Sequence, residues 1–262
     1  MQNKMSKGVH SYFRKYLFCF LVLIMCVFSI SCGLDVYYIL YPPSDSQIVN
    51  ENTEALGRYF SFRTADVENK GMDIYTGTAV IYKIYNTLSQ LRTDSFSINN
   101  YNSEFSDKGY NRATEALGYQ KMILSNNDIP LITKSYNNRS VEIRLFTEGY
   151  VDDPYRAGIK ISGQYVMDGS DIAIPLRENE STFSFYSSSA NTVVNDRSYQ
   201  NSIPEQDNID VKYVQLTDEN TENVWYVNAY AVSIGMTPDF TYKYSQLEPL
   251  GYIVISESDF DN

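Results

Sequence analysis

Alternation of apolar and polar side chains with a period of two residues constrains the fold of this chain more than any other feature. In the segment 141–146, Val141, Ile143 and Leu145 lie on one side and Glu142 and Arg144 on the other, and residues 78–86 alternate in a similar way. This period is typical of half-buried β-strands. The 24 tyrosines and 13 phenylalanines favour the same structure, because aromatic side chains are enriched in strands. The sequence therefore predicts a mainly β domain.

Turn signals between the strand-like segments indicate antiparallel connections. Segments 164–167 and 171–174 are joined by an Asp-Gly-Ser turn, in which glycine tolerates a positive φ. The two longest strand-like segments, 209–216 and 223–234, are linked by polar residues, and we expect them to form one long hairpin. Residues 182–186 are expected to add a short strand.

One segment departs from this pattern. Between residues 87 and 105, apolar side chains recur at i, i+3 and i+7 after a potential cap at Asn86, which predicts an amphipathic helix. A second helical turn is expected at 110–117, so that residues 87–118 form a helical insertion. Strands separated by turns favour an antiparallel β-sandwich or barrel. Residues 223–234 are apolar on both faces, as in a central strand, which favours the sandwich; an immunoglobulin-like or fibronectin-like topology fits this pattern.

The first 31 residues are built differently from the rest. Their strong charges are all basic, and the run 16–30 is apolar and contains no charged residue. Small residues then lead to Cys32. A basic region, a short apolar run and a small-residue exit form a secretory signal. The run of about 15 residues is shorter than the ~20 that a spanning helix needs; an uncleaved signal anchor is the alternative.

The sequence Phe-Ser-Ile-Ser-Cys at 28–32 resembles a bacterial lipobox, in which a signal peptidase cuts before a cysteine that carries diacylglycerol. Ser29 occupies the position where a strict lipobox usually has leucine. We expect cleavage before Cys32 and an anchor of several acyl chains, each buried methylene contributing about 0.8 kcal/mol. The expected location is the extracytoplasmic side of a cell membrane or outer membrane. An ordinary signal peptide with an incidental cysteine is the alternative.

The residues that follow the cysteine carry a further resemblance. Cys-Gly-Leu, a tyrosine pair and a double proline within residues 32–43 look like the mature N-terminus of a group of uncharacterised spirochaete lipoproteins of the treponemal type. The segment Tyr-Lys-Ile-Tyr-Asn at 82–86 looks like a recurring strand of the same group. The resemblance implies a lipoprotein and carries no activity or catalytic residue with it.

Removal of the signal would change the chemistry of the chain. Cys19, Cys26 and the sole histidine, His10, would be lost, and the remaining Cys32 would be acylated. Such a chain cannot use Ser-His-Asp or Cys-His catalysis, bind zinc through histidine or cysteine, or form an internal disulfide. We therefore expect no catalytic residue, no metal site and no cofactor.

The signal contains four basic and no acidic residues, so its loss changes the net charge from −11 to −15. An acidic surface disfavours nucleic acid as a partner. The expected organisation is a signal peptide at 1–31, a lipidated N-terminus and polar tether at 32–57, and a β-sandwich domain at 58–262.

Acidic residues gather at 152–153, 168–171 and 218–219. Carboxylates that are close together can bind Ca²⁺, but the chain has no EF-hand loop pattern, and aspartate is a common turn residue. We therefore favour turns at these places. A glycosidase would need two carboxylates about 5 to 9.5 Å apart, and the sequence singles out no such pair.

Tyrosine and tryptophan form a third set of candidates, because they offer large area and a polar tip to a partner. Most of them, Trp225 included, are expected in the sandwich core. Tyr242 and Tyr244, which flank Lys243 after a turn at Pro238, are the predicted exposed binding pair. The sequence thus predicts a non-catalytic, lipid-anchored cell-envelope protein that binds or assembles with an envelope protein or a glycan; a carbohydrate-binding or glycan-processing module is the alternative.

Overall fold

The computed structural model describes most of the chain after residue 37 and a few residues before it. The described residues are 16–18, 20, 38–47, 58–126, 130–145, 157–185, 191–200, 202–215 and 224–256. The chain divides into two compact units, Met1–Tyr37 and Tyr38–Asn262. In the first unit residues 16–18 and 20 are helical, and Cys32 lies outside the described residues. No helix among the described residues is both long and apolar enough to cross a membrane.

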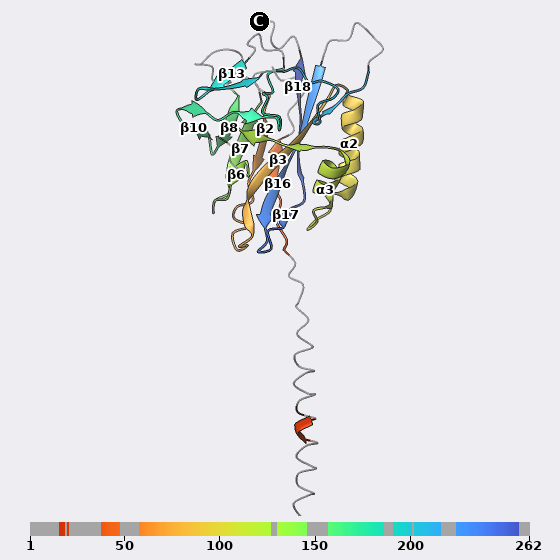
Figure 1. Cartoon of the computed structure of the whole chain (residues 1–262), viewed down its shortest axis with the longest axis vertical. Coiled ribbons are helices and arrows are strands. Elements are labelled where there is room, and N and C mark those ends of the chain that lie inside the picture. The colour runs from red at the N-terminus through yellow and green to blue at the C-terminus, as the bar shows by residue number, and fades with distance from the viewer. Residues whose placement is uncertain are drawn as a thin grey trace, which may run out of the picture. The chain divides into compact units, whose positions relative to one another are not determined.

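Two long antiparallel strands, β3 (Tyr75–Tyr85) and β16 (Val224–Met236), form the centre of the second unit (Figure 1). They are paired along almost their whole length, with Tyr226 opposite Tyr85 near one end of the ladder. We call the seven-stranded sheet around them the long sheet. Its other strands are β17 (Tyr242–Tyr244) and β18 (Glu248–Ser256) beside β16, and β4 (Gln120–Lys121), β6 (Ile132–Thr133) and β15 (Val211–Lys212) beside β3.

A second sheet, the short sheet, packs against one face of the long sheet. Its five antiparallel strands are, in spatial order, β1 (Ser44–Gln47), β2 (Phe60–Arg63), β7 (Ser140–Arg144), β8 (Gly158–Ile161) and β9 (Gln164–Tyr165). The main hydrophobic core combines side chains of both sheets, such as Phe60 and Ile143 from the short sheet and Tyr82 and Val227 from the long sheet. The predicted mainly β fold with antiparallel sheets packed as a sandwich is therefore confirmed. Among the described strand pairs only β15–β3 is parallel.

The helical insertion predicted at 87–118 is also confirmed, and it covers the other face of the long sheet (Figure 1). It consists of α2 (Leu88–Tyr101), α3 (Lys108–Asn111) and a π-helical turn, η2 (Arg112–Ala116). Ile81 and Val232 of the long sheet pack with Leu91, Ile98 and Tyr110 of these helices in a second core. Because one face of β3 and β16 meets the short sheet and the other meets helices, both faces are apolar, as expected for central strands.

Asn86 does not cap α2 as the sequence suggested. The N-cap is Thr87, which makes no side-chain capping bond. The Asn86 amide instead donates to the carbonyl of Val214 at 2.6 Å, and the Val214 N–H donates to Asn86 Oδ1 at 2.9 Å. Asn86 therefore joins the end of β3 to the segment after β15.

Three small two-stranded antiparallel sheets complete the described strands. They are β10 (Met167–Asp168) with β11 (Asp171–Ile172), β5 (Ile123–Leu124) with β12 (Pro175–Leu176), and β13 (Asn191–Val194) with β14 (Arg197–Gln200). The Asp-Gly-Ser turn predicted after residue 167 is present, and Gly169 has a φ of 62°. That positive φ is the reason why glycine stands there.

The predicted long hairpin between 209–216 and 223–234 is wrong. β15 pairs in parallel with β3, and β16 lies between β3 and β18. The sequence shows that β16 needs apolar neighbours, but one of its partners, β3, lies 141 to 160 positions earlier in the chain. Such a choice of partner is not visible in the local pattern.

The prediction of a short strand at 182–186 is also wrong for residues 182–185, which are the described part of this range. Thr182 makes only an isolated bridge with Leu176, although Phe183 and Phe185 are buried in the main core. Trp225 lies in that core as expected, with its ring centroid 6.5 Å from that of Phe185.

The second unit begins earlier than the predicted boundary at residue 58. Leu40 is buried with Ile74 and Tyr75 in a small core, and β1 pairs with β2. The Tyr41 N–H donates to Asn69 Oδ1 at 2.8 Å, and Asn69 Nδ2 donates back to the Tyr41 carbonyl at 3.0 Å. The polar composition of residues 44–47 concealed this strand, because β1 is an exposed edge strand.

Candidate functional site

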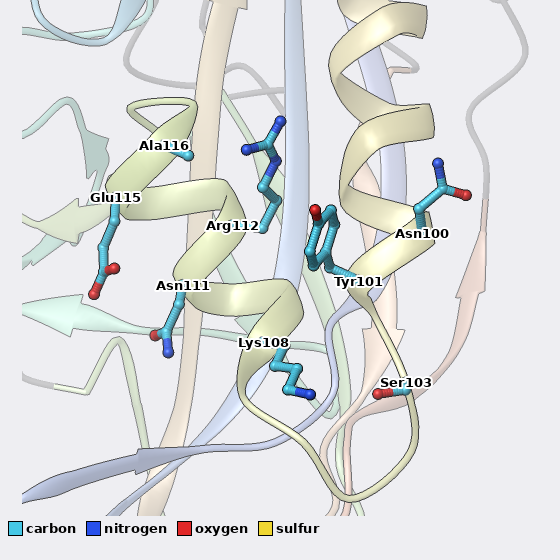
Figure 2. Close-up of a pocket in the computed structure, with 8 residues that line it drawn as sticks. All are labelled: Asn100, Tyr101, Ser103, Lys108, Asn111, Arg112, Glu115 and Ala116. Carbon is cyan, nitrogen blue, oxygen red and sulfur yellow. The ribbon is translucent and has the colours of Figure 1, made fainter.

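A pocket of about 590 Å³ lies between the C-terminal end of α2 and the turns of α3 and η2 (Figure 2). Small-molecule sites have volumes of about 300–1,000 Å³, so this pocket has the size of a ligand site. Its wall is formed by Asn100, Tyr101, Ser103, Lys108, Asn111, Arg112, Glu115 and Ala116. We call it the α2–α3 pocket.

The π-helical turn η2 shapes one wall of this pocket. A π-turn adds a residue to the helical ladder and widens it, and such turns are frequent at functional sites. The turn is followed by Gly118, whose φ is 71°, and an added Cβ there would lie 2.9 Å from Lys83 Nζ. The backbone conformation therefore favours glycine, and a larger residue would also displace the end of the Lys83 side chain.

Arg112 and Tyr101 form the centre of the pocket and project toward each other from η2 and α2 in Figure 2. The Arg112 guanidinium carbon is 5.4 Å from the centroid of the Tyr101 ring, and Arg112 Nε donates to Ser97 Oγ at 3.0 Å. The ring and the hydroxyl hold the guanidinium in place. Lys108 adds a second cation and Glu115 an anion, so the pocket offers charge, amides and an aromatic face to a polar ligand.

The predicted pair Tyr242 and Tyr244 lies on β17, at the edge of the long sheet. The Tyr244 ring stacks on that of Tyr110 from α3, with centroids 3.5 Å apart and an interplanar angle of 11°. Tyr242 lies 6.4 Å from Tyr244 at 27°, and Lys121 Nζ is 5.6 and 5.8 Å from the two ring centroids. We call these four residues the tyrosine cluster.

Exposure differs within the tyrosine cluster. Tyr242 is 50% exposed, whereas Tyr110 is buried and covers one face of Tyr244. Burial and then the hydrogen bond with Tyr244 raise the pKa of the Tyr110 hydroxyl above its ordinary value, so it remains neutral. The cluster therefore presents mainly the Tyr242 ring, and the binding role of Tyr242 and Tyr244 stays a prediction. Sequence reasoning did not identify Tyr110 or Lys121 as their partners.

Three buried carboxylates form a separate pattern along β3. Each accepts hydrogen bonds from one tyrosine of β3 and from one cation of another segment. The sets are Asp66 with Tyr75 at 3.0 Å and Arg139 at 2.9 Å, Asp210 with Tyr82 at 2.8 Å and Arg177 at 2.7 Å, and Asp94 with Tyr85 at 3.0 Å and Lys212 at 2.8 Å. Burial is the first cause that raises the pKa of each of these tyrosines.

These sets join β3 to distant parts of the chain. Perturbed pKa values mark candidate chemical groups, but each of these carboxylates is already bound by a cation of the same domain. Their evident effect is to fix the loop 66–74, α2 and the segment before β15 against β3. We therefore interpret them as structural.

Only one of the three predicted acidic groups lies within the described residues. Residues 152–153 and 218–219 lie outside the described part of the chain, and residues 168–171 form the β10–β11 turn. Asp171 accepts a hydrogen bond from the Asn195 N–H at 2.5 Å. Over the described ranges, no three acidic, histidine or cysteine residues are placed to hold a metal ion. The turn interpretation of 168–171 is confirmed.

No family model, no curated protein and no solved structure matches this chain. The resemblance to spirochaete lipoproteins and the immunoglobulin-like or fibronectin-like topology therefore stay predictions.

Proposed function

We propose that this chain is a lipid-anchored lipoprotein of the cell envelope that binds a polar ligand in the α2–α3 pocket without catalysis. The observation that carries the proposal is the pairing of Arg112 with Tyr101 in a pocket of ligand size. An arginine held against an aromatic ring beside amide groups suits a ligand that has hydroxyl and anionic groups. Because the chain is acidic overall, the two cations of the pocket, Lys108 and Arg112, would give local selectivity for such groups.

The anchor rests on the N-terminal sequence, with its basic region, short apolar run and Cys32. Labelled palmitate should be incorporated into the native chain and into Cys26→Ala, which keeps the proposed acylation site. The label should be absent from Cys32→Ala. Label that persists in Cys32→Ala would overturn the anchor.

The pocket is tested by titration calorimetry with a panel of neutral and uronate-containing oligosaccharides. We expect uronate-containing members to bind, Arg112→Ala to weaken binding at least tenfold, and Arg112→Lys to weaken it less because the charge is kept. Arg92→Ala is the matched control, since Arg92 is exposed on the same helical insertion but outside the pocket. Equal affinity of Arg112→Ala and Arg92→Ala would exclude the pocket as the binding site.

The second candidate is a carbohydrate-binding module that uses the tyrosine cluster. The half-exposed Tyr242 ring, with Lys121 beside it, favours this candidate because aromatic faces stack on sugars. Tyr242→Ala should then abolish retention on immobilised neutral polysaccharide, whereas Tyr136→Ala, at another exposed tyrosine, should not. Retention of both variants would remove this candidate.

A further inference from the structure

Three segments of the second unit that carry exposed apolar side chains meet at one end of the domain. They are residues 38–41, the loop 102–107 after α2, and the hairpin 236–242 between β16 and β17 (Figure 1). The ring of Tyr41 is 6.3 Å from that of Phe105. The Leu40 side chain lies next to Gly235, immediately before the hairpin. We call this region the tether end.

The tether end exposes seven large apolar or aromatic side chains beside the carboxylates of Glu104 and Asp239. Its exposed large side chains are Tyr38, Ile39, Tyr41, Phe105, Met236, Phe240 and Tyr242. Phe240 is 81% exposed and Phe105 is 58% exposed. A concentration of apolar side chains on a surface marks an interaction with a protein or a membrane.

The backbone at these two phenylalanines gives independent support. Phe240 has a φ of 62° and Phe105 a φ of 56°, a left-handed conformation that is rare for bulky residues. Thr237 and Thr241 close the β16–β17 hairpin through a backbone bond of 3.0 Å, and Phe240 is the last of three loop residues, where glycine is usual. An exposed phenylalanine at such a position works against local stability, which points to a role for its side chain.

The distance to the proposed anchor determines what this surface meets. Tyr38 is six positions after Cys32, and a fully extended chain of that length spans at most about 22 Å. If acyl chains hold Cys32 in a bilayer, Tyr38 must lie close to the lipid head groups. The side chains around Tyr38 then face the same membrane surface.

We propose that the tether end docks on the lipid bilayer that anchors Cys32, with Phe105 and Phe240 inserted at the level of the head groups. The proposal rests on the lipid anchor of the proposed function. Tyrosine is enriched at the membrane interface, and phenylalanine is common on the apolar face of segments that lie in it. The chain is acidic and gains little from anionic lipid, so the contact depends on apolar insertion and is insensitive to salt.

The test uses the full lipidated chain in phosphatidylcholine vesicles that contain lipids labelled with a spin quencher just below the head group. Tryptophan is introduced as Phe240→Trp, and as Val193→Trp in β13, which lies at the opposite end of the domain in Figure 1. The native Trp225 is buried and gives the baseline. We expect the Phe240→Trp signal to be quenched at least twofold and the Val193→Trp signal to stay within a tenth of its value without quencher, at low and at high salt.

Mass spectrometry of the same samples reports the lipid on Cys32, so the two ideas can fail separately. A chain without lipid would overturn the proposed anchor. A lipidated chain in which the fluorescence of Phe240→Trp is not quenched would overturn the docking proposal. The proposal would also be overturned if, in detergent, a second copy of the chain shielded this tryptophan from the quencher. Near-ultraviolet circular dichroism of each variant confirms that the fold is retained.

Discussion

Replacement of Arg177 by methionine should destabilise the domain strongly, because it removes the cation from a carboxylate that water cannot reach. Arg177 is fully buried and Asp210 nearly so. Arg177 donates from Nε and Nη2 to the two oxygens of Asp210 at 2.8 and 2.7 Å, and from Nη2 to Asn208 Oδ1 at 2.8 Å. The hydroxyl of Tyr82 is the other side-chain donor to Asp210.

The size of the loss in stability follows from the unpaired Asp210 carboxylate that Arg177→Met leaves in the core. Breaking a buried pair by removing one partner costs about 3–5 kcal/mol, since the remaining charge is uncompensated. In Arg177→Met/Asp210→Asn the uncompensated charge is gone, and the remaining loss should be about 1–2 kcal/mol from broken hydrogen bonds. The single variant should therefore be less stable than the double variant.

The variants are made in a Cys32→Ala background, which lacks the proposed lipid. Urea unfolding followed by circular dichroism then measures the difference in unfolding free energy between the single and the double variant. With a slope of about 3 kcal/mol per molar urea for a domain of this size, a loss of about 4 kcal/mol lowers the midpoint by about 1.3 M. Asp210→Asn alone supplies the fourth corner of the cycle. A loss below about 1 kcal/mol in Arg177→Met, or a double variant as unstable as the sum of the two single variants, would refute the reasoning.

Three further predictions concern the backbone and the buried tyrosines. Phe240→Gly should raise the free energy of unfolding by about 1 kcal/mol, because glycine adopts the positive φ of that position without strain; no gain in urea midpoint would contradict the strain argument. Gly118→Ala should lower the free energy of unfolding by about 1–2 kcal/mol, because Gly118 has a positive φ and lies close to Lys83. Gly163→Ala is the control, since Gly163 also has a positive φ but its surroundings are open. Above pH 10 the stability should fall, since the tyrosines of β3 have raised pKa values in the folded state and ionise first in the unfolded chain. Each of these tyrosines contributes about 1.4 kcal/mol per pH unit to the fall of the unfolding free energy with pH. Tyr82→Phe should therefore reduce this slope by that amount. An unchanged slope would show that Tyr82 ionises in the folded protein.

The sequence was sufficient for features that depend on local periodicity. The alternation in 141–146 requires one buried face, and Val141 and Ile143 are both buried in β7. The i, i+3, i+7 spacing after residue 87 likewise predicted α2. A period fixes which face of an element is apolar and hence the kind of element.

Features that depend on the choice of partner could not be obtained in this way. The pairing of β16 with β3 and the bond of Tyr82 to Asp210 join residues more than 100 positions apart. The sequence therefore indicated Tyr242 and Tyr244 but not their neighbours Tyr110 and Lys121. The α2–α3 pocket was indicated even less by the sequence. Its lining residues look like ordinary surface residues in the sequence, and only the fold of η2 places Arg112 opposite Tyr101.

The attachment of residues 40 and 41 has a mechanical consequence. Leu40 is held by Ile74 and Tyr75, and Tyr41 exchanges two hydrogen bonds with Asn69, so a pull on the N-terminal side of the domain reaches these contacts before it reaches β1. The force then passes directly into β3, which is bonded to β16 along almost its whole length. A force on the domain is thus distributed over the many hydrogen bonds between β3 and β16. The exposed edge strand β1 does not have to resist that force, so it stays paired with β2.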